Sequence, residues 1–255
     1  MIPSIKQLLR SGKTTIGSWM QLPHPSVAEI MAHGEFDWVA VDLEHGAVSC
    51  ERLADLFRAF ESKGTAPFVR VAQAASKDIK QALDAGCRGL IVPMIETREQ
   101  IEAVIAWAQY PPDGTRGVGY SRANVFGKEF PGYFSEINRS LTIVAQIESI
   151  QAIENLESIL SVPGIDAVMV GPYDLSASMG ITGQFEHPKF HQAMAVYEAT
   201  ARRAHVPLGL HIVQPDCAAL HKKIQDGYQF IAYGIDAVFL YRNAVNPLAI
   251  NAKNN

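Results

Sequence analysis

A set of carboxylate, imidazole, guanidinium and amide side chains in this sequence shares one property: each ends or closely follows a short apolar run. The set consists of Asp42, Glu44, His45, Arg70, Gln146, Glu148 and Asp174. Carboxylates bind hard divalent cations, imidazole moves protons near pH 7, and a guanidinium stabilises a developing oxyanion. Together these residue types predict a site that forms and stabilises an enolate.

Glu148, in "VAQIES", and Asp174, in "GPYDLS", are the predicted ligands of a divalent metal ion. Their oxygens are hard donors without a cysteine or histidine cluster beside them, so Mg²⁺, Mn²⁺ or Co²⁺ is favoured over zinc. Two protein ligands leave coordination positions open for a substrate that chelates through a carboxylate and an adjacent carbonyl. A metal that polarises such a 2-oxo acid makes its C3 protons more acidic.

The remaining polar groups suit the same chemistry. Arg70 is expected to hold the developing oxyanion, and a neutral His45 has a pKa suited to moving protons at pH 7. The "VGPYDLS" turn is predicted to begin a helix, where the backbone N–H groups of Tyr173 and Asp174 would face the substrate carboxylate.

Short apolar runs that alternate with stretches of helical periodicity predict the fold. The runs lie at residues 14–20, 38–43, 67–71, 89–94, 142–148, 167–171, 207–212 and 230–234. Strands that are apolar almost throughout are covered on both faces, and their alternation with helices requires parallel crossovers. Eight such repeats predict one α/β domain over residues 1–255, a (β/α)8 TIM barrel.

In such a barrel the chemistry lies at the carboxyl ends of the strands, where the polar residues fall. Each residue also has a structural alternative. Asp42 could cap a loop or pair with Arg70, Glu148 could favour the first turn of a helix, and Asp174 could cap one. A functional site explains better why all of them fall on one rim.

Composition limits the partners of the protein. Over 255 residues the formal net charge is −4, which gives no electrostatic footprint for nucleic acid or an anionic membrane. Three scattered cysteines form no metal-ligand spacing. The N-terminal segment lacks the apolar core of a signal peptide, and no apolar run reaches the length of a membrane span. A small-molecule partner and a cytoplasmic location are expected.

Residues 110–141 interrupt the alternation as an insertion rich in glycine, proline and aromatic residues before the fifth strand. A loop of this length is usually functional. Arg122, in "GYSRANVFG", is predicted to bind a hydroxylated or carboxylate-bearing tail of the substrate. The alternative is that Arg122 or Arg116 ties the loop to an acidic residue of the barrel or of an adjoining subunit.

Several motifs resemble, in order and spacing, the metal-dependent (class II) pyruvate aldolases of the HpcH/HpaI family. They are "FDWVAVDLEHG", "APFVRV", "GLIVPMIET", "YPPDGTRGVGYSRANVFG", "IVAQIES" and "GIDAVMVGPYDLSASMG". The likeness runs from about residue 14 to residue 240. It is greatest to members that cleave 2-dehydro-3-deoxy sugar acids such as 2-dehydro-3-deoxyglucarate.

The resemblance implies a role for each matching residue. Glu148 and Asp174 would bind the metal, Arg70 would lie on the pyruvate carbonyl, and His45 would act as acid and base with a water molecule. Asp42 would orient His45. Gln146, Gly171 and the amides of Tyr173 and Asp174 would contact pyruvate. Tyr173 stands where the family has a small residue such as Ser, so its ring is expected to reshape the aldehyde side of the pocket. A homohexamer or trimer whose subunits exchange their last helix is also implied.

The leading functional prediction is reversible retro-aldol cleavage of a 4-hydroxy-2-oxo acid to pyruvate and an aldehyde. An enolate enzyme that decarboxylates oxaloacetate, or joins the enolate to another electrophile, stays open as an alternative. A Schiff-base aldolase would need a lysine at a strand end, and the lysines fall in predicted helices or loops. A non-enzymatic binding barrel would not need the acidic and basic residues gathered on one rim.

Overall fold

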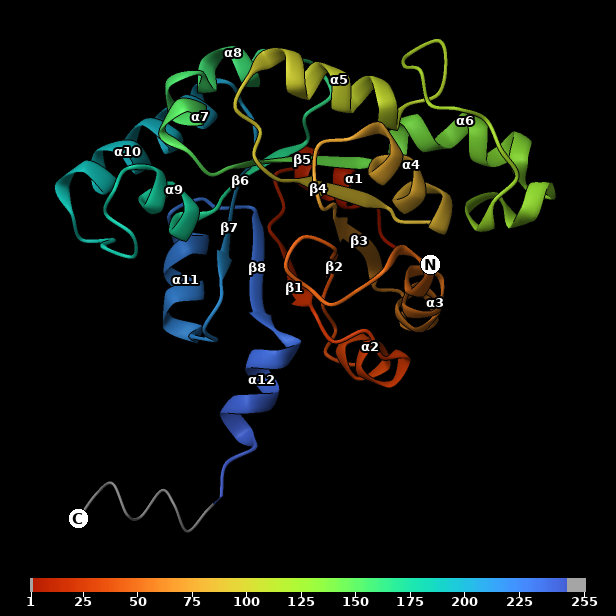
Figure 1. Ribbon diagram of the computed structural model, residues 1–255, viewed down its shortest axis with the longest axis horizontal. Helices are drawn as coiled ribbons and strands as arrows, with labels where there is room; N and C mark the ends of the chain where they lie inside the picture. Colours follow the sequence, from red (N-terminus) through yellow and green to blue (C-terminus); the bar gives the residue numbers. More distant parts are fainter. Residues whose placement is uncertain (1, 247–255) are drawn as a thin grey trace.

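The computed structural model describes residues 2–246, and the ends of the predicted domain, residue 1 and residues 247–255, lie outside the described part. Eight parallel strands close into a barrel in the order β1 to β8 (Figure 1). The strands are β1 Thr15–Met20, β2 Trp38–Asp42, β3 Ala66–Arg70, β4 Gly89–Val92, β5 Thr142–Ile147, β6 Ala167–Val170, β7 Leu208–Ile212 and β8 Phe230–Ile235. The predicted (β/α)8 barrel is therefore confirmed, with every strand inside or within one residue of its predicted run.

The barrel interior is packed with aromatic rings. Trp38 of β2 stacks on Phe230 of β8 with ring centroids 4.2 Å apart, and Phe68 of β3 lies 5.3 Å from the Trp38 ring. Glycines make room for these rings, since a Cβ at Gly17 would lie 2.1 Å from Trp38 and one at Gly89 2.1 Å from Phe68. Close packing of this kind makes the interior a solid core that leaves space only at the ends.

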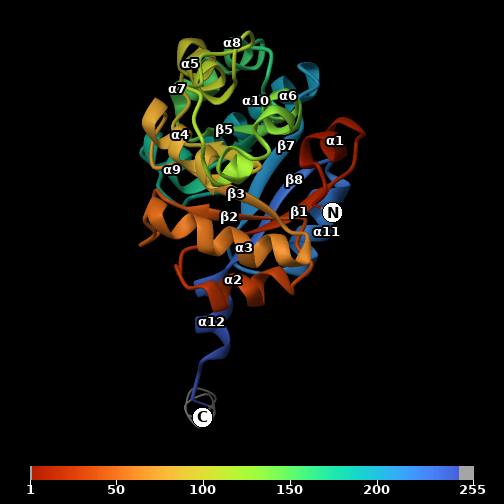
Figure 2. The same ribbon diagram turned by 90° about the vertical axis from the view of Figure 1, so that its right-hand side faces the viewer.

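Helices cover the outside of the barrel (Figure 2). They are α1 Ile5–Arg10, α2 Pro25–Ala32, α3 Leu53–Lys63, α4 Ser76–Ala85, α5 Arg98–Ala108, α6 Phe130–Ser140, α7 Ile150–Glu154, α8 Leu156–Leu160, α9 Pro172–Ser178, α10 Pro188–Arg203, α11 Cys217–Gln225 and α12 Asp236–Asn243, with 3-10 turns η1 Cys50–Arg52 and η2 Arg122–Gly127. Their apolar faces form the larger hydrophobic cluster against the outer faces of the strands. Within the described residues, no helix is both long and apolar enough to cross a membrane.

The insertion at residues 110–141 is more ordered than the sequence predicted. The expectation of a loop is wrong for Phe130–Ser140, which forms α6. Phe134 of this helix stacks on Tyr110 with ring centroids 4.8 Å apart, and Ile137 is buried. The apolar positions 130, 134 and 137 follow helical spacing. The Gly- and Pro-rich composition around them favoured a loop, so the helix was not predicted.

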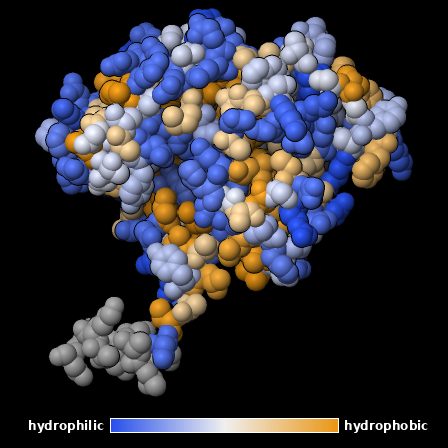
Figure 3. Space-filling view, in the orientation of Figure 1, coloured by the Kyte–Doolittle hydropathy of each residue, from blue (hydrophilic) through white to orange (hydrophobic). Residues whose placement is uncertain are grey.

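The last described helix, α12, packs on the barrel only through its first part, where Val238 is buried and the Phe239 ring lies 6.5 Å from that of Tyr233. It projects beyond the barrel in both ribbon views (Figures 1 and 2). Leu240 and Tyr241 of this helix are 60% and 55% exposed. Hydrophobic surface gathers around the point where α12 leaves the barrel (Figure 3).

Candidate active site

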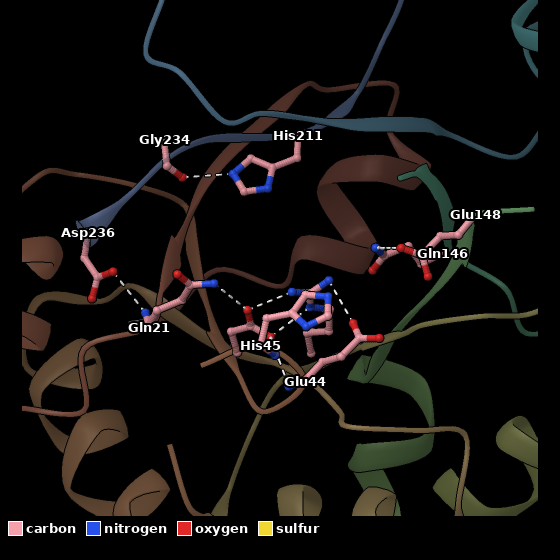
Figure 4. A network of polar contacts seen from close by, with 10 residues as sticks. Gln21, Glu44, His45, Gln146, Glu148, His211, Gly234 and Asp236 are labelled. Atoms are coloured by element: carbon pink, nitrogen blue, oxygen red, sulfur yellow. Dashed lines mark hydrogen bonds and ion pairs between the residues drawn. The ribbon is translucent and has the colours of Figure 1, made fainter. Parts of the chain in front are cut away.

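A cavity of about 320 Å³ opens at the carboxyl ends of the strands. Its lining includes six of the residues predicted for the site: His45, Arg70, Gln146, Gly171, Tyr173 and Asp174. Two further predicted residues, Asp42 and Glu148, bind Arg70 and Gln146 from behind. The barrel thus brings together groups from the ends of β2, β3, β5 and β6 that lie up to about 130 positions apart in the chain. Figure 4 shows Glu44 and His45 after β2 near Gln146 and Glu148 of the β5 end.

Asp42 and Arg70 form a buried, bidentate ion pair. The Arg70 Nε donates to Asp42 Oδ1 at 2.9 Å, and Nη2 donates to Oδ2 at 2.7 Å. Gln21 also donates to Oδ2 at 2.9 Å. Burial by itself raises the pKa of Asp42, but the Arg70 hydrogen bonds and charge outweigh it and lower that pKa to about 2. Asp42 is therefore a carboxylate at neutral pH, and it fixes the Arg70 fork.

Glu44 binds the other side of the Arg70 fork, with Oε2 2.8 Å from Nη1. Asp42 engages two of the five guanidinium N–H donors by hydrogen bonds, and the Glu44 contact is an ion pair in which Oε2 makes no hydrogen bond within the described residues. Arg70 therefore keeps N–H donors that a ligand can engage, and it lines the cavity.

His45 follows β2 and is an exposed residue that lines the cavity. Asp42 Oδ1 accepts hydrogen bonds from the backbone N–H groups of Glu44 and His45 at 3.1 and 3.2 Å. Asp42 thus shapes the turn that carries His45 through its backbone.

Glu148 is buried at the end of β5 and is held by two donors. Its Oε2 accepts from the Met94 N–H at 3.0 Å, and its Oε1 accepts from Gln146 Nε2. Burial raises the pKa of Glu148 to about 7, and the negative charges of Glu44 and Asp174 add to the effect. Met94 has a φ of 54°, an uncommon backbone conformation that turns its N–H toward the carboxylate.

The turn after β6 brings α9 to the same place. A Cβ at Gly171 would lie 2.5 Å from Glu148 Oε1, so only glycine allows this approach. Asp174 lies in the first turn of α9 and lines the cavity. Tyr173 is 56% exposed, and its ring meets Phe185 edge-to-face with centroids 5.0 Å apart. The bulky ring predicted to reshape the pocket stands at the cavity wall.

The residues present fit a divalent metal ion with few protein ligands. Among the described residues, no group of three or more His, Cys, Asp and Glu side chains is arranged to hold a metal. A buried carbonyl oxygen, Gln146 Oε1, has no hydrogen-bond partner, and it belongs to the side chain that binds Glu148. An unpartnered buried oxygen next to a buried carboxylate is costly unless a cation or a donor completes it. The donor set is oxygen-only, as Mg²⁺ and Mn²⁺ prefer.

Sequence reasoning missed three residues of the cavity wall: Trp19, Gln21 and His211. Trp19 lies within the predicted apolar run 14–20, and its ring lies 5.1 Å from the Arg70 guanidinium carbon. His211 lies within the predicted run 207–212 and was given no role. Their place at strand ends was the available signal.

Arg122 is not brought to this cavity. Its Nη2 lies 2.5 Å from Glu61 Oε2, and its Nη1 donates to the Ala85 carbonyl at 2.9 Å. Glu61 and Ala85 stand at the carboxyl ends of α3 and α4, which precede β3 and β4 and therefore lie at the opposite end of the barrel from the cavity. Arg116 is likewise tied to Asp84, at 3.0 Å. Within the chain, these contacts agree with the alternative prediction, in which Arg122 and Arg116 tie the insertion to acidic residues of the barrel.

A larger hollow of about 640 Å³ lies at that opposite end, lined in part by Arg10, Asp166 and Arg202. Its buried acid, Asp166, is already paired with Lys6 at 3.1 Å. Since the amino ends of barrel strands serve stability, we place the chemistry in the smaller cavity.

A closed barrel with a polar cavity at the carboxyl ends of its strands is the architecture of a (β/α)8-barrel enzyme. A family model described as HpcH/HpaI aldolase/citrate lyase matches residues 15–244, and the chain belongs to this family. The resemblance predicted from the sequence motifs is thereby confirmed.

Individual relatives agree with the family. The chain is 38% identical to a 4-hydroxy-2-oxovalerate aldolase of Novosphingobium aromaticivorans over 250 residues, which is 97% of this chain and 94% of that protein. It is 36% identical to a 2-keto-3-deoxy-L-rhamnonate aldolase of Escherichia coli (strain K12), covering 94% and 90% of the two chains. A crystal structure of a family member from Burkholderia cenocepacia J2315 superposes with a TM-score of 0.90 at 33% identity over 99% of both chains.

Proposed function

We propose that this protein cleaves a 4-hydroxy-2-oxo acid reversibly to pyruvate and an aldehyde with the cavity at the mouth of the barrel. The predicted reaction class, a carbon–carbon lyase of the aldolase type, is confirmed by the family and by its aldolase relatives. One observation carries the assignment of the site: Arg70, which keeps N–H donors beyond those that bind Asp42, shares a cavity with Gln146, whose buried Oε1 has no hydrogen-bond partner among the described residues.

The pyruvate half of the substrate is proposed to lie between Arg70 and Gln146. A divalent metal held by Glu148 and Asp174 would polarise the 2-oxo acid and stabilise its enolate when bound. Arg70 donates a free Nη hydrogen to the oxyanion, and its fork stays in place because Asp42 accepts two of its hydrogen bonds and Glu44 forms an ion pair with Nη1. Gly171 leaves the space beside Glu148 that a larger residue would fill.

His45 is proposed to move the proton of the C4 hydroxyl, directly or through water. It lines the same cavity as Arg70, and the turn that carries it is fixed by Asp42. In cleavage His45 takes the hydroxyl proton as the C3–C4 bond breaks, so the C4 hydroxyl becomes the aldehyde carbonyl and the bond electrons become the enolate. Proton return to C3 of that enolate yields pyruvate.

The ion is proposed to be Mg²⁺, Mn²⁺ or Co²⁺, because the two carboxylates of Glu148 and Asp174 are hard oxygen ligands that would hold it exchangeably. Product analysis tests the function directly. The protein, supplied with Mn²⁺, is incubated with 4-hydroxy-2-oxo acids of different length, and pyruvate and aldehyde are quantified together. Equal amounts of both products are expected. Decarboxylation of oxaloacetate without cleavage of any 4-hydroxy-2-oxo acid would favour the alternative enolate enzyme instead.

We also propose that the protein is cytoplasmic and assembles into a homo-oligomer, a hexamer or trimer, through α12. This helix projects from the barrel with Leu240 and Tyr241 exposed, and Ile30 of α2 is 70% exposed. Isolated exposed helices of this length have little reason to persist without a packing partner. Sedimentation of the wild type and of a Leu240→Asp variant tests this, and a monomeric wild type would refute it.

A further inference from the structure

His211 of β7 presents a hydrogen-bond acceptor to the cavity. Its Nε2 lies 3.0 Å from the Gly234 carbonyl oxygen of the neighbouring strand β8. A carbonyl only accepts, so the neutral ring must carry its hydrogen on Nε2. The other ring nitrogen, Nδ1, then has a free lone pair. Figure 4 shows this second nitrogen on the side of the ring that faces the centre of the site.

The ring is held in this orientation by a second contact. It stacks on Trp19 with centroids 4.8 Å apart and 27° between the planes, and Trp19 is itself 2% exposed. Arg70 lies over the same indole, at 5.1 Å. Trp19 therefore fixes the position of the imidazole relative to the Arg70 guanidinium. This spacing determines how far apart two groups of one ligand must be if one binds Arg70 and the other binds His211.

The imidazole is uncharged at neutral pH. Burial lowers the pKa of His211 to about 4, and the positive charge of Arg70 lowers it further than burial alone would. An uncharged ring with its hydrogen directed to Gly234 can only accept at Nδ1. The contacts of the described residues give Nδ1 no partner, so it is open to a ligand.

The surroundings of His211 differ from those of the proposed pyruvate site. Figure 4 places His211 opposite His45 and Glu44, and apart from Glu148 and Gln146. Its ring lies on the Trp19 indole, and Val213 and Ile235 are further apolar residues of the cavity lining. An acceptor beside apolar groups favours a ligand whose donor group meets it, because an unmatched polar group loses its hydration on binding.

We propose that His211 Nδ1 accepts a hydrogen bond from a hydroxyl group on the aldehyde part of the substrate, which makes His211 a specificity-determining residue for hydroxylated aldehydes. This proposal rests on the proposed aldolase function. The chemistry selects the group: a hydroxyl can donate to Nδ1, a carboxylate at the same place would set acceptor against acceptor, and an ammonium would meet the Arg70 charge. The favoured class is therefore aldehydes with a hydroxyl near the carbonyl.

Matched aldehyde pairs test the proposal. The full-length protein with Mn²⁺ is assayed in the aldol direction with pyruvate, and kcat/KM is compared for glycolaldehyde against acetaldehyde and for lactaldehyde against propionaldehyde. Each pair differs by one hydroxyl. The variants are His211→Leu, which removes both ring nitrogens, and His211→Asn, whose Oδ1 can replace the Nδ1 acceptor. His221→Leu, an exposed histidine of α11, is the matched control.

The wild type is expected to prefer the hydroxylated member of each pair. His211→Leu should lower that preference about threefold to tenfold, the worth of one neutral hydrogen bond. His211→Asn should keep part of the preference, and His221→Leu should keep all of it. If His211→Leu does not fold, His211→Gln, which retains a donor for Gly234, takes its place.

Two results would overturn the proposal while the aldolase function stands. One is an active wild type with no preference for hydroxylated aldehydes. The other is a His211 variant that loses activity toward both members of a pair by the same factor, which would give the residue a structural role. If the wild type joins pyruvate to none of the four aldehydes and cleaves no 4-hydroxy-2-oxo acid, the proposed function fails first.

Discussion

Asp42 and Arg70 face each other in register on β2 and β3, and two hydrogen bonds of 2.9 and 2.7 Å join the buried carboxylate to the guanidinium fork. A buried arginine needs such a partner, because an unpaired charge in this environment is costly. The pair stabilises the barrel rim and leaves further Arg70 N–H donors for a ligand. The stability of the barrel and the position of the Arg70 guanidinium in the site therefore both depend on the ion pair between Asp42 and Arg70.

Asp42→Asn should destabilise the protein by about 3 kcal/mol at pH 7, since it leaves the Arg70 charge without a buried carboxylate. The difference should depend on pH. The folded-state pKa of Asp42, about 2, lies below its ordinary value of 3.8, so its stabilising effect is present above pH 4 and is lost as the pH falls toward 2. Urea unfolding of both proteins at pH 7, 4 and 3 measures it. A difference in unfolding free energy between the two proteins that is the same at pH 7, 4 and 3 contradicts the lowered pKa of Asp42.

Arg70→Lys should abolish most of the enolate chemistry although it keeps the charge. A lysine ammonium cannot hold Asp42 bidentately and still direct donors into the cavity. We expect a loss of about 100-fold to 1000-fold in the exchange of pyruvate C3 protons with solvent, followed by NMR in D₂O. Exchange at the wild-type rate would remove Arg70 from the mechanism.

His45→Gln should separate the two halves of the reaction. The variant lacks the imidazole that takes the hydroxyl proton but leaves Glu148, Gln146 and Arg70 in place, so aldol cleavage should fall by about 100-fold, and more than pyruvate proton exchange does. Metal affinity, measured by calorimetry with Mn²⁺, is the control readout. Cleavage and exchange that fall by equal factors would place His45 in the enolate step instead.

Treatment with EDTA should remove the activity, and added Mg²⁺, Mn²⁺ or Co²⁺ should restore it, because two carboxylate ligands hold an ion exchangeably. Asp174→Asn should weaken Mn²⁺ binding about tenfold or more, whereas the surface variant Asp55→Asn on α3 should not change it. Mn²⁺ binding can be followed by electron paramagnetic resonance. Full activity after exhaustive chelation would refute the metal-dependent mechanism.

The sequence predicted the strands well for a physical reason. Strands such as β3 and β5 are buried at every position, so they read as continuous apolar runs. The rim residues followed from the strand ends. The stack of Trp19 on His211 could not be predicted, because it joins β1 to β7, which become neighbours on either side of β8 only when the barrel closes.

Arg122 shows the other limit of sequence reasoning. Its loop follows α5 and was expected beside the cavity, but a loop of this length can return along either end of a barrel. The choice depends on long-range partners, here Glu61 at the end of α3. The sequence around residue 122 contains no local pattern that indicates where the Glu61 carboxylate lies.

The ion pair between Arg122 and Glu61 gives the last prediction. Both side chains are partly buried, at 17% and 27% exposure, and Arg122 also donates to the Ala85 carbonyl. Arg122→Ala should therefore destabilise the protein, and a double-mutant cycle with Glu61→Gln should give a coupling energy of about 1 kcal/mol, as for a partly exposed pair with good geometry. Because the pair lies at the far end of the barrel from the cavity, the preference between matched aldehydes should not follow the loss of stability. A selective rise in KM for hydroxylated or acidic aldehydes in Arg122→Ala, with stability and coupling unchanged, would instead make Arg122 a substrate-binding residue, reached from the cavity of another subunit.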